Sequence, residues 1–209
     1  MQGFQKVVGH QEIITHLQNA ISMNKVSHAY LFGGESGSGK KMMASLFAMT
    51  LQCEKHGVEP CMECPSCKKA QSQNHPDIIY VKHEKPNTIS IDEIREQLIN
   101  DVMIKPYSSP YKIYIIDEAQ KLTLQAQNAL LKTLETPPGQ SVIIMTCDNV
   151  RAMLPTIISR CRVINFQPLP METVEKYLLN KGVLPERAHL LSALSGGSIG
   201  RALDMDGNE

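Results

Sequence analysis

The sequence lacks an excess of charge of either sign, because 21 lysine and arginine residues balance 21 aspartate and glutamate residues. This balance gives no overall basic field for tight, direct binding of nucleic acid, although a local basic patch stays open. No apolar run reaches the ~18–20 residues of a membrane-spanning helix. Residues 1–17 have neither the apolar core nor the cleavage site of a secretory signal. We therefore expect a cytoplasmic protein.

Internal repeats and low-complexity segments are also lacking, and what the 209 residues contain instead is an alternation of strand and helix patterns. Such alternation predicts an α/β fold with a parallel sheet and helices on both faces. A Pro-Leu-Pro joint at 168–170 then precedes three helical patterns, which suggest a small helical domain. The expected strands are 29–32, 77–81, 112–116, 141–146 and 162–166, and the expected helices are 10–23, 41–52, 90–98, 122–135, 151–160, 171–182, 186–195 and 199–205.

A glycine-rich loop follows the first expected strand and has the form G-x-x-x-x-G-K from Gly34 to Lys40. In a P-loop of this kind, backbone N–H groups wrap a phosphate chain and the lysine reaches the β and γ phosphates. The next residue normally supplies a hydroxyl to Mg²⁺, and Lys41 has no acceptor atom to do so. ATP or ADP is therefore a candidate ligand, with Mg²⁺ in doubt. The candidate phosphate-binding residues are Gly34, Glu35, Ser36, Gly37, Ser38, Gly39, Lys40 and Lys41.

Acidic residues end the strand pattern KIYII at Asp117 and Glu118, which is typical of a Walker B motif. Asp117 would hold the Mg²⁺ shell and Glu118 would polarise an attacking water. Ligands of open parallel sheets bind at the carboxyl ends of the strands, so this motif should meet the P-loop. The alternative is that the two acids only cap the next helix.

Four of the six cysteines lie close together, at Cys53, Cys61, Cys64 and Cys67. Four thiolates around one ion form a closed, structural Zn²⁺ site. In a reducing compartment this spacing indicates metal binding before disulfides. His56 and His75 are alternative ligands, and an iron–sulfur cluster or free cysteines are alternative interpretations.

Two arginines stand in motifs whose role the residues alone leave open. Arg160, in Ser-Arg-Cys before the last expected strand, could pair with a surface carboxylate or act as a finger on a neighbouring subunit's nucleotide. Arg201 follows Gly-Gly-Ser-Ile-Gly and could contact the phosphates or stay in solvent.

Taken together, these motifs resemble the AAA+ clamp-loader ATPases of bacterial DNA polymerase III, the family of the delta-prime and gamma/tau subunits. The resemblance spans nearly the whole chain and includes SHAYLFGGESGSGKK, the four-cysteine insert, NALLKTLETPP, TIISRC and GGSIGRAL. It implies an AAA+ domain over 1–167 with the zinc module at 53–67, and a helical lid domain over 168–209. It also implies an all-helical collar domain that this chain does not contain.

The resemblance also implies roles for individual residues. Arg160 would act in trans on a neighbour's ATP, Arg201 would be the sensor 2 residue, and either Thr146 or Cys147 would be sensor 1. The implied partners are gamma/tau and delta subunits in a hetero-pentamer that places the sliding clamp on primer-template DNA. The chain would thus be a component of the polymerase III holoenzyme, a nucleotidyltransferase complex.

Lys41 departs from the motor subunits of this family and puts hydrolysis by this chain in doubt. The sequence therefore favours a delta-prime-like subunit with a degenerate P-loop. Two alternatives stay open: an active gamma/tau-type ATPase, and a zinc-stabilised scaffold that binds no nucleotide.

Overall fold

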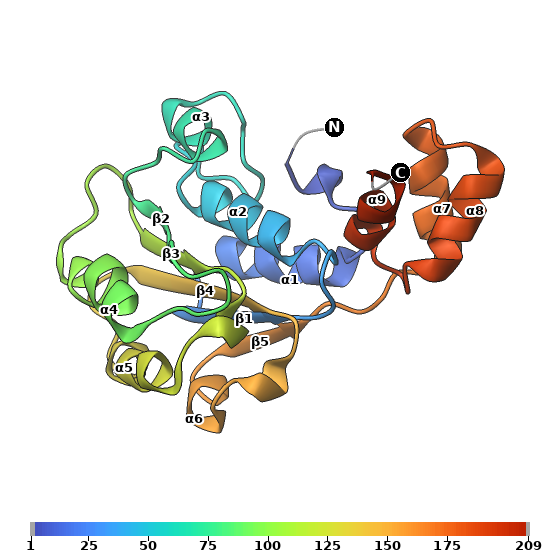
Figure 1. Cartoon of the computed structure of the whole chain (residues 1–209). Helices are drawn as coiled ribbons and strands as arrows, with labels where there is room; N and C mark the ends of the chain where they lie inside the picture. The colour runs from blue at the N-terminus through green and yellow to red at the C-terminus, as the bar shows by residue number, and fades with distance from the viewer. Residues whose placement is uncertain (1–2, 208–209) are drawn as a thin grey trace.

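One parallel sheet of five strands forms the centre of the fold, in the order β2-β3-β4-β1-β5 (Figure 1). The structure is a computed structural model that describes residues 3–207. The register places Gly33 opposite Cys147 and Ile116 opposite Met145, so the carboxyl ends of β1, β3 and β4 lie together. The expected α/β fold is confirmed. The strands are β1 (Ala29–Gly33), β2 (Ile78–Tyr80), β3 (Lys112–Ile116), β4 (Ser141–Cys147) and β5 (Arg162–Asn165).

Two hydrophobic cores cover the two faces of the sheet. Tyr30 and Phe32 of β1 point into the first core, which is closed by a short 3₁₀ helix at Gly3–Lys6, by α1 (Gln11–Ser22) and by α2 (Lys40–Leu51). Leu31 points the other way, into the core under α4 (Ile91–Ile94), α5 (Leu124–Glu135) and α6 (Pro155–Ile158). Because β1 is buried along its whole length, every one of its residues is apolar or small.

One helix was not expected, and two expected helices differ from the structure. The cysteine insert, which shows no amphipathic period, contains the short helix α3 (Pro65–Gln71), with Pro65 in its first turn. The helix expected from 90 begins with a capping box at Ser90 but becomes a π-helix over Arg95–Ile99. The helix expected over 151–160 is divided into a 3₁₀ turn (Val150–Ala152) and α6, since a residue before proline disfavours the α conformation.

The last three helices, α7 (Met171–Asn180), α8 (Pro185–Leu194) and α9 (Ile199–Gly207), share a core of their own. They stand beside the sheet, and α9 returns to the side where α1 and α2 begin (Figure 1). Ser198, just before α9, donates a hydrogen bond from its hydroxyl to the carbonyl of Ser36 at 2.8 Å. No helix within residues 3–207 is long and apolar enough to cross a membrane.

Candidate functional site

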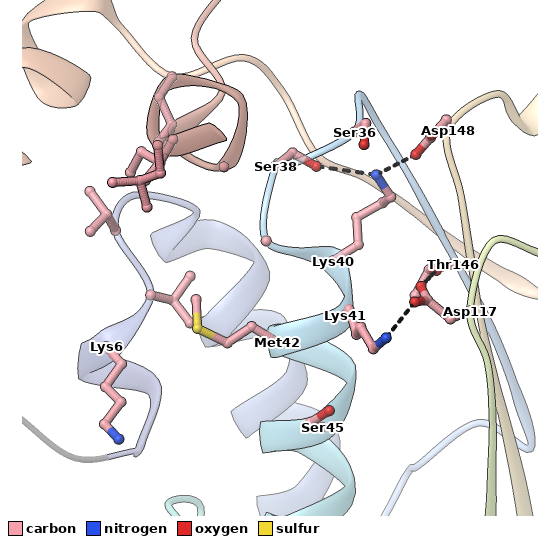
Figure 2. Close-up of a pocket in the computed structure, with 18 of the residues that line it drawn as sticks. Lys6, Ser36, Ser38, Lys40, Lys41, Met42, Ser45, Asp117, Thr146 and Asp148 are labelled. Atoms are coloured by element: carbon pink, nitrogen blue, oxygen red, sulfur yellow. Dashed lines mark hydrogen bonds and ion pairs between the residues drawn. The ribbon is translucent and has the colours of Figure 1, made fainter. Parts of the chain in front are cut away.

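The P-loop connects β1 to α2, and its lysine is held by the loop itself. The ammonium of Lys40 donates to the carbonyls of Gly34 and Glu35, at 2.7 Å each, and pairs with Asp148 at 3.0 Å. Asp148 follows β4, and the sequence patterns do not single it out. Its position directly after a strand of a parallel sheet is the one feature that could have indicated it. Figure 2 shows Lys40 between Ser38 and Asp148.

The ammonium of Lys41 lies 2.9 Å from Oδ2 of Asp117, at the tip of β3. The other oxygen of Asp117 accepts a hydrogen bond from the hydroxyl of Thr146 at 2.6 Å (Figure 2). Burial alone would raise the pKa of Asp117, but the bonds from Thr146 and Lys41 outweigh it and hold that pKa below its usual value. The pairing in turn raises the pKa of Lys41. Both carboxylate oxygens of Asp117 are therefore engaged by protein donors.

Three further candidate residues, Glu118, Thr146 and Cys147, lie at the ends of β3 and β4, and their side chains have different surroundings. Glu118 adopts a left-handed conformation with φ of 52° and pairs with Lys121 at 2.6 Å. The backbone N–H of Glu118 donates to the hydroxyl of Thr146 at 3.1 Å. The thiol of Cys147 is buried in the core under α5, so of the two sensor 1 candidates only Thr146 faces the cleft.

The cleft between the P-loop, the sheet tips and the last helices has a volume of about 610 Å³. Its polar wall is the P-loop with Asp117, Thr146 and Asp148. Arg201 lies at the edge of this region, with its guanidinium 3.8 Å from the carboxylate of Glu35. The apolar wall comes from the N-terminal segment, α2 and the last helices: Val7, Val8, Met42, Leu169, Tyr177, Ile199 and Leu203.

Gly37 of the P-loop packs closely against the start of α9. A side chain at this position should push the P-loop and α9 apart. At φ of +75°, a Cβ on Gly37 would lie 2.6 Å from the Ser198 hydroxyl and 2.7 Å from the Arg201 backbone nitrogen. We expect Gly37→Ala to lower the free energy of unfolding by about 2–4 kcal/mol, from left-handed strain and overpacking together. Urea unfolding would measure this loss.

Gly39→Ala is the matched control, because Gly39 also has a positive φ, of +90°, and its nearest neighbour to a new Cβ is 4.0 Å away. It should lose only the strain, about 1–2 kcal/mol. Equal losses in the two variants would contradict close contact between α9 and the P-loop.

The four cysteines of the insert converge on one point. Their sulfur atoms all lie within 4.8 Å of one another, and Sγ of Cys61 and of Cys67 are 3.9 Å apart. Tetrahedral Zn²⁺ with Zn–S bonds of about 2.3 Å holds sulfurs roughly 3.8 Å apart, so the donor set fits a structural zinc ion. Backbone N–H groups of Cys64 and Glu63 lower the pKa of the Cys61 thiol, whereas burial raises the pKa of the neighbouring Cys67 thiol.

The histidines considered as alternative ligands have other surroundings. His75 is buried, with Nε2 3.0 Å from the hydroxyl of Ser66, and its Nδ1 accepts from the backbone of Asp77. Neither His75 nor His56 belongs to the cluster found among the described residues.

Arg160 lies at the amino-terminal ends of the strands, whereas the cleft lies at their carboxyl ends. Its guanidinium pairs with Glu135 at the end of α5 and donates to the carbonyl of Thr156 at 2.9 Å. The same shallow surface includes His28, which immediately precedes β1, whereas the P-loop follows β1. The strand between them has five residues, about 16 Å in length. The structure therefore does not bring Arg160 to the P-loop of its own chain.

Comparison with known proteins places these features in a family. The family model described as DNA polymerase III, delta subunit, matches residues 9–170. The delta-prime subunit of DNA polymerase III from Bacillus subtilis is 36% identical over 92% of this chain and 58% of that protein. The tau subunit from the same organism is 40% identical over 83% of the chain and 30% of that protein.

Solved structures show the same fold at lower identity. A gamma subunit-related protein of Thermotoga maritima superposes with a TM-score of 0.59 and 22% identity, over 87% of this chain and 57% of that one. RuvB of Thermotoga maritima gives a TM-score of 0.65 at 12% identity, over 98% and 63% of the two chains. The chain thus spans little more than half the length of the delta-prime relative. Since the family model covers more than half of the chain, the chain belongs to the DNA polymerase III clamp-loader family of delta-prime subunits and their tau/gamma relatives.

Proposed function

We propose that this chain is a subunit of the clamp loader of DNA polymerase III and does not itself drive ATP hydrolysis. Its partners would be gamma/tau and delta subunits, and the assembly would load the sliding clamp onto primed DNA in the cytoplasm. Residues 1–167 would be the AAA+ domain and 168–209 the lid. The chain would contribute Arg160 in trans to the ATP of a neighbouring subunit.

The position of Arg160 carries this proposal. Its side chain is 32% exposed and lies at the amino-terminal ends of the strands. The P-loop follows β1 and therefore lies at the other end. A surface ion pair such as Arg160–Glu135 contributes only about 0–1 kcal/mol, so a nearby phosphate can replace Glu135 at little cost. From this position Arg160 can contact a nucleotide bound to a neighbouring subunit, but it cannot reach the P-loop of its own chain.

Reconstitution tests the proposal directly. The chain would be mixed with gamma/tau and delta subunits of its own organism, and DNA-stimulated ATP hydrolysis and clamp loading would be measured with and without it. We expect both rates to rise when the chain is added. If the chain neither joins the complex nor changes these rates, the proposed role is wrong.

A gamma/tau-type motor is the second candidate, and the intact Asp117-Glu118 pair together with 40% identity to a tau subunit favours it. The isolated chain would then hydrolyse ATP. We expect the isolated chain not to hydrolyse ATP, because the Lys41 ammonium already pairs with Asp117, the carboxylate that would hold the Mg²⁺ shell. ATP hydrolysis that persists in the isolated wild type and is lost in Glu118→Gln would support the motor instead.

We propose Zn²⁺ as the ion of the four-cysteine cluster. The fit of the sulfur positions supports it, and the closed ligand set leaves no coordination position for a substrate. The ion would serve the fold and not the chemistry.

A further inference from the structure

The cleft beside the P-loop keeps the parts that bind a nucleotide even though its metal ligand is replaced. Its volume of about 610 Å³ is within the usual range of small-molecule sites. Within residues 3–207, the backbone N–H groups of Gly37, Gly39 and Lys40 donate to no protein acceptor. Side chains such as Val8, Tyr177 and Leu203 offer an apolar wall on the other side of the cleft, suited to a base.

The position of Lys41 distinguishes this cleft from a metal-dependent one. Its ammonium has three donors, and Asp117 uses one of them, at 2.9 Å. The side chain is 61% exposed and lines the cleft, so the other two donors are left for solvent or a ligand. A divalent cation at Asp117 would have to displace this ammonium, and would find no hydroxyl at position 41 to complete its shell.

The negative charge of a nucleotide's phosphates can also be neutralised in this cleft without Mg²⁺. A nucleoside diphosphate or triphosphate normally needs Mg²⁺ to neutralise its oxygens beside the Walker B carboxylate. Here Lys41 supplies a positive charge at that carboxylate, and its charge is fixed to the chain. The phosphate chain can therefore meet Lys40, Lys41 and the free N–H groups without a metal ion.

We infer that this cleft binds a nucleoside diphosphate or triphosphate without Mg²⁺, and that the Lys41 ammonium takes the place of the metal. The inference rests on the proposed function, in which this site does not hydrolyse ATP. Mg²⁺ then weakens binding or leaves it unchanged, because it masks the charge of the phosphates that Lys41 would attract.

The test is a titration of the full chain with ADP, by calorimetry, with Mg²⁺ either omitted or added at millimolar concentration. Mg²⁺ is omitted rather than removed with a chelator, since a chelator would also attack the four-cysteine site. We expect wild-type chain to bind ADP in both conditions, with no tightening by Mg²⁺. Lys41→Thr restores the P-loop hydroxyl, and Mg²⁺ should then tighten binding by about tenfold or more.

Two further variants control the measurement. Lys132→Thr, on the exposed face of α5, changes the same residue type outside the cleft and should behave as wild type. Lys40→Ala should weaken ADP binding in both conditions. Absence of ADP binding to the wild type, tightening of wild-type binding by Mg²⁺, or a Lys41→Thr variant that ignores Mg²⁺ would each overturn the inference. None of these results changes the expectation for Arg160 in the assembled loader, so the two proposals fail separately.

Discussion

Replacing Arg160 by alanine is expected to lower the ATPase rate of a complete reconstituted loader by about a thousandfold or more at the site that receives this arginine. An arginine finger stabilises the charge that develops on the transferred phosphoryl group, and Arg160 is the only lysine or arginine among the described residues that line the shallow surface with Glu135 and His28. Steady-state phosphate release from the assembled complex would measure the loss. The free chain should show no change, since the affected site belongs to its neighbour.

Three variants separate a finger from a structural arginine. Arg160→Lys keeps the charge but not the planar pair of donors, so it should recover only part of the rate. Glu135→Gln removes the ion pair in the free chain and should leave the loader active, because Glu135 only holds Arg160 before assembly. Arg151→Ala, an exposed arginine after β4, is the matched control and should have no effect. An Arg160→Ala loader that assembles normally and hydrolyses ATP at the wild-type rate would rule out the trans role.

The fold could be predicted from the sequence because its strands are short apolar runs with sharp ends. β1, β3 and β4 lie within one residue of the expected ranges, since Gly33 and Asp117 directly mark where two of them stop. The helices were less predictable where local chemistry competes with periodicity. Pro155 divides one expected helix, and Pro65 starts a helix that has no apolar period of its own.

The candidate site was predicted as a set of residues but not as a set of contacts. The sequence shows that Lys41 cannot bind Mg²⁺, but not that its ammonium reaches Asp117, because that depends on how far α2 stands from the tip of β3. Likewise, Asp148 and Glu135 come from parts of the chain distant from Lys40 and Arg160. These two ion pairs depend on the tertiary structure, which cannot be read from motifs or from residue spacing.

Removal of the proposed Zn²⁺ from the four-cysteine site is expected to have the largest effect on stability. Cys53 and Cys67 are fully buried and belong to the same core as α1 and α2. The insert is also tied to the rest of the fold through Glu59, which accepts from the backbone of Phe4 at 3.1 Å and from the side chain of Gln18 at 2.7 Å. Loss of the metal would leave four unligated thiols with nothing to hold them together inside this core, so the damage would extend beyond the insert.

We expect Cys64→Ser to cost about 4–5 kcal/mol or more, in the range found when a structural metal is lost. For a chain of this length, such a loss corresponds to a fall in Tm of roughly 10–20 °C. Thermal unfolding followed by circular dichroism would measure it, together with elemental analysis for one zinc per chain. A strong chelator should produce the same shift in the wild type and none in Cys64→Ser, because the variant has no ion left to lose.

Cys161→Ser is the control, since Cys161 is a partly buried cysteine outside the cluster. It should retain one zinc per chain and unfold within a few degrees of the wild type, because replacing a partly buried thiol by a hydroxyl removes little apolar contact. Iron with a visible colour in place of zinc would favour an iron–sulfur cluster. A wild-type chain that contains no stoichiometric metal and unfolds identically with and without chelator would show that the four thiols pack as free cysteines.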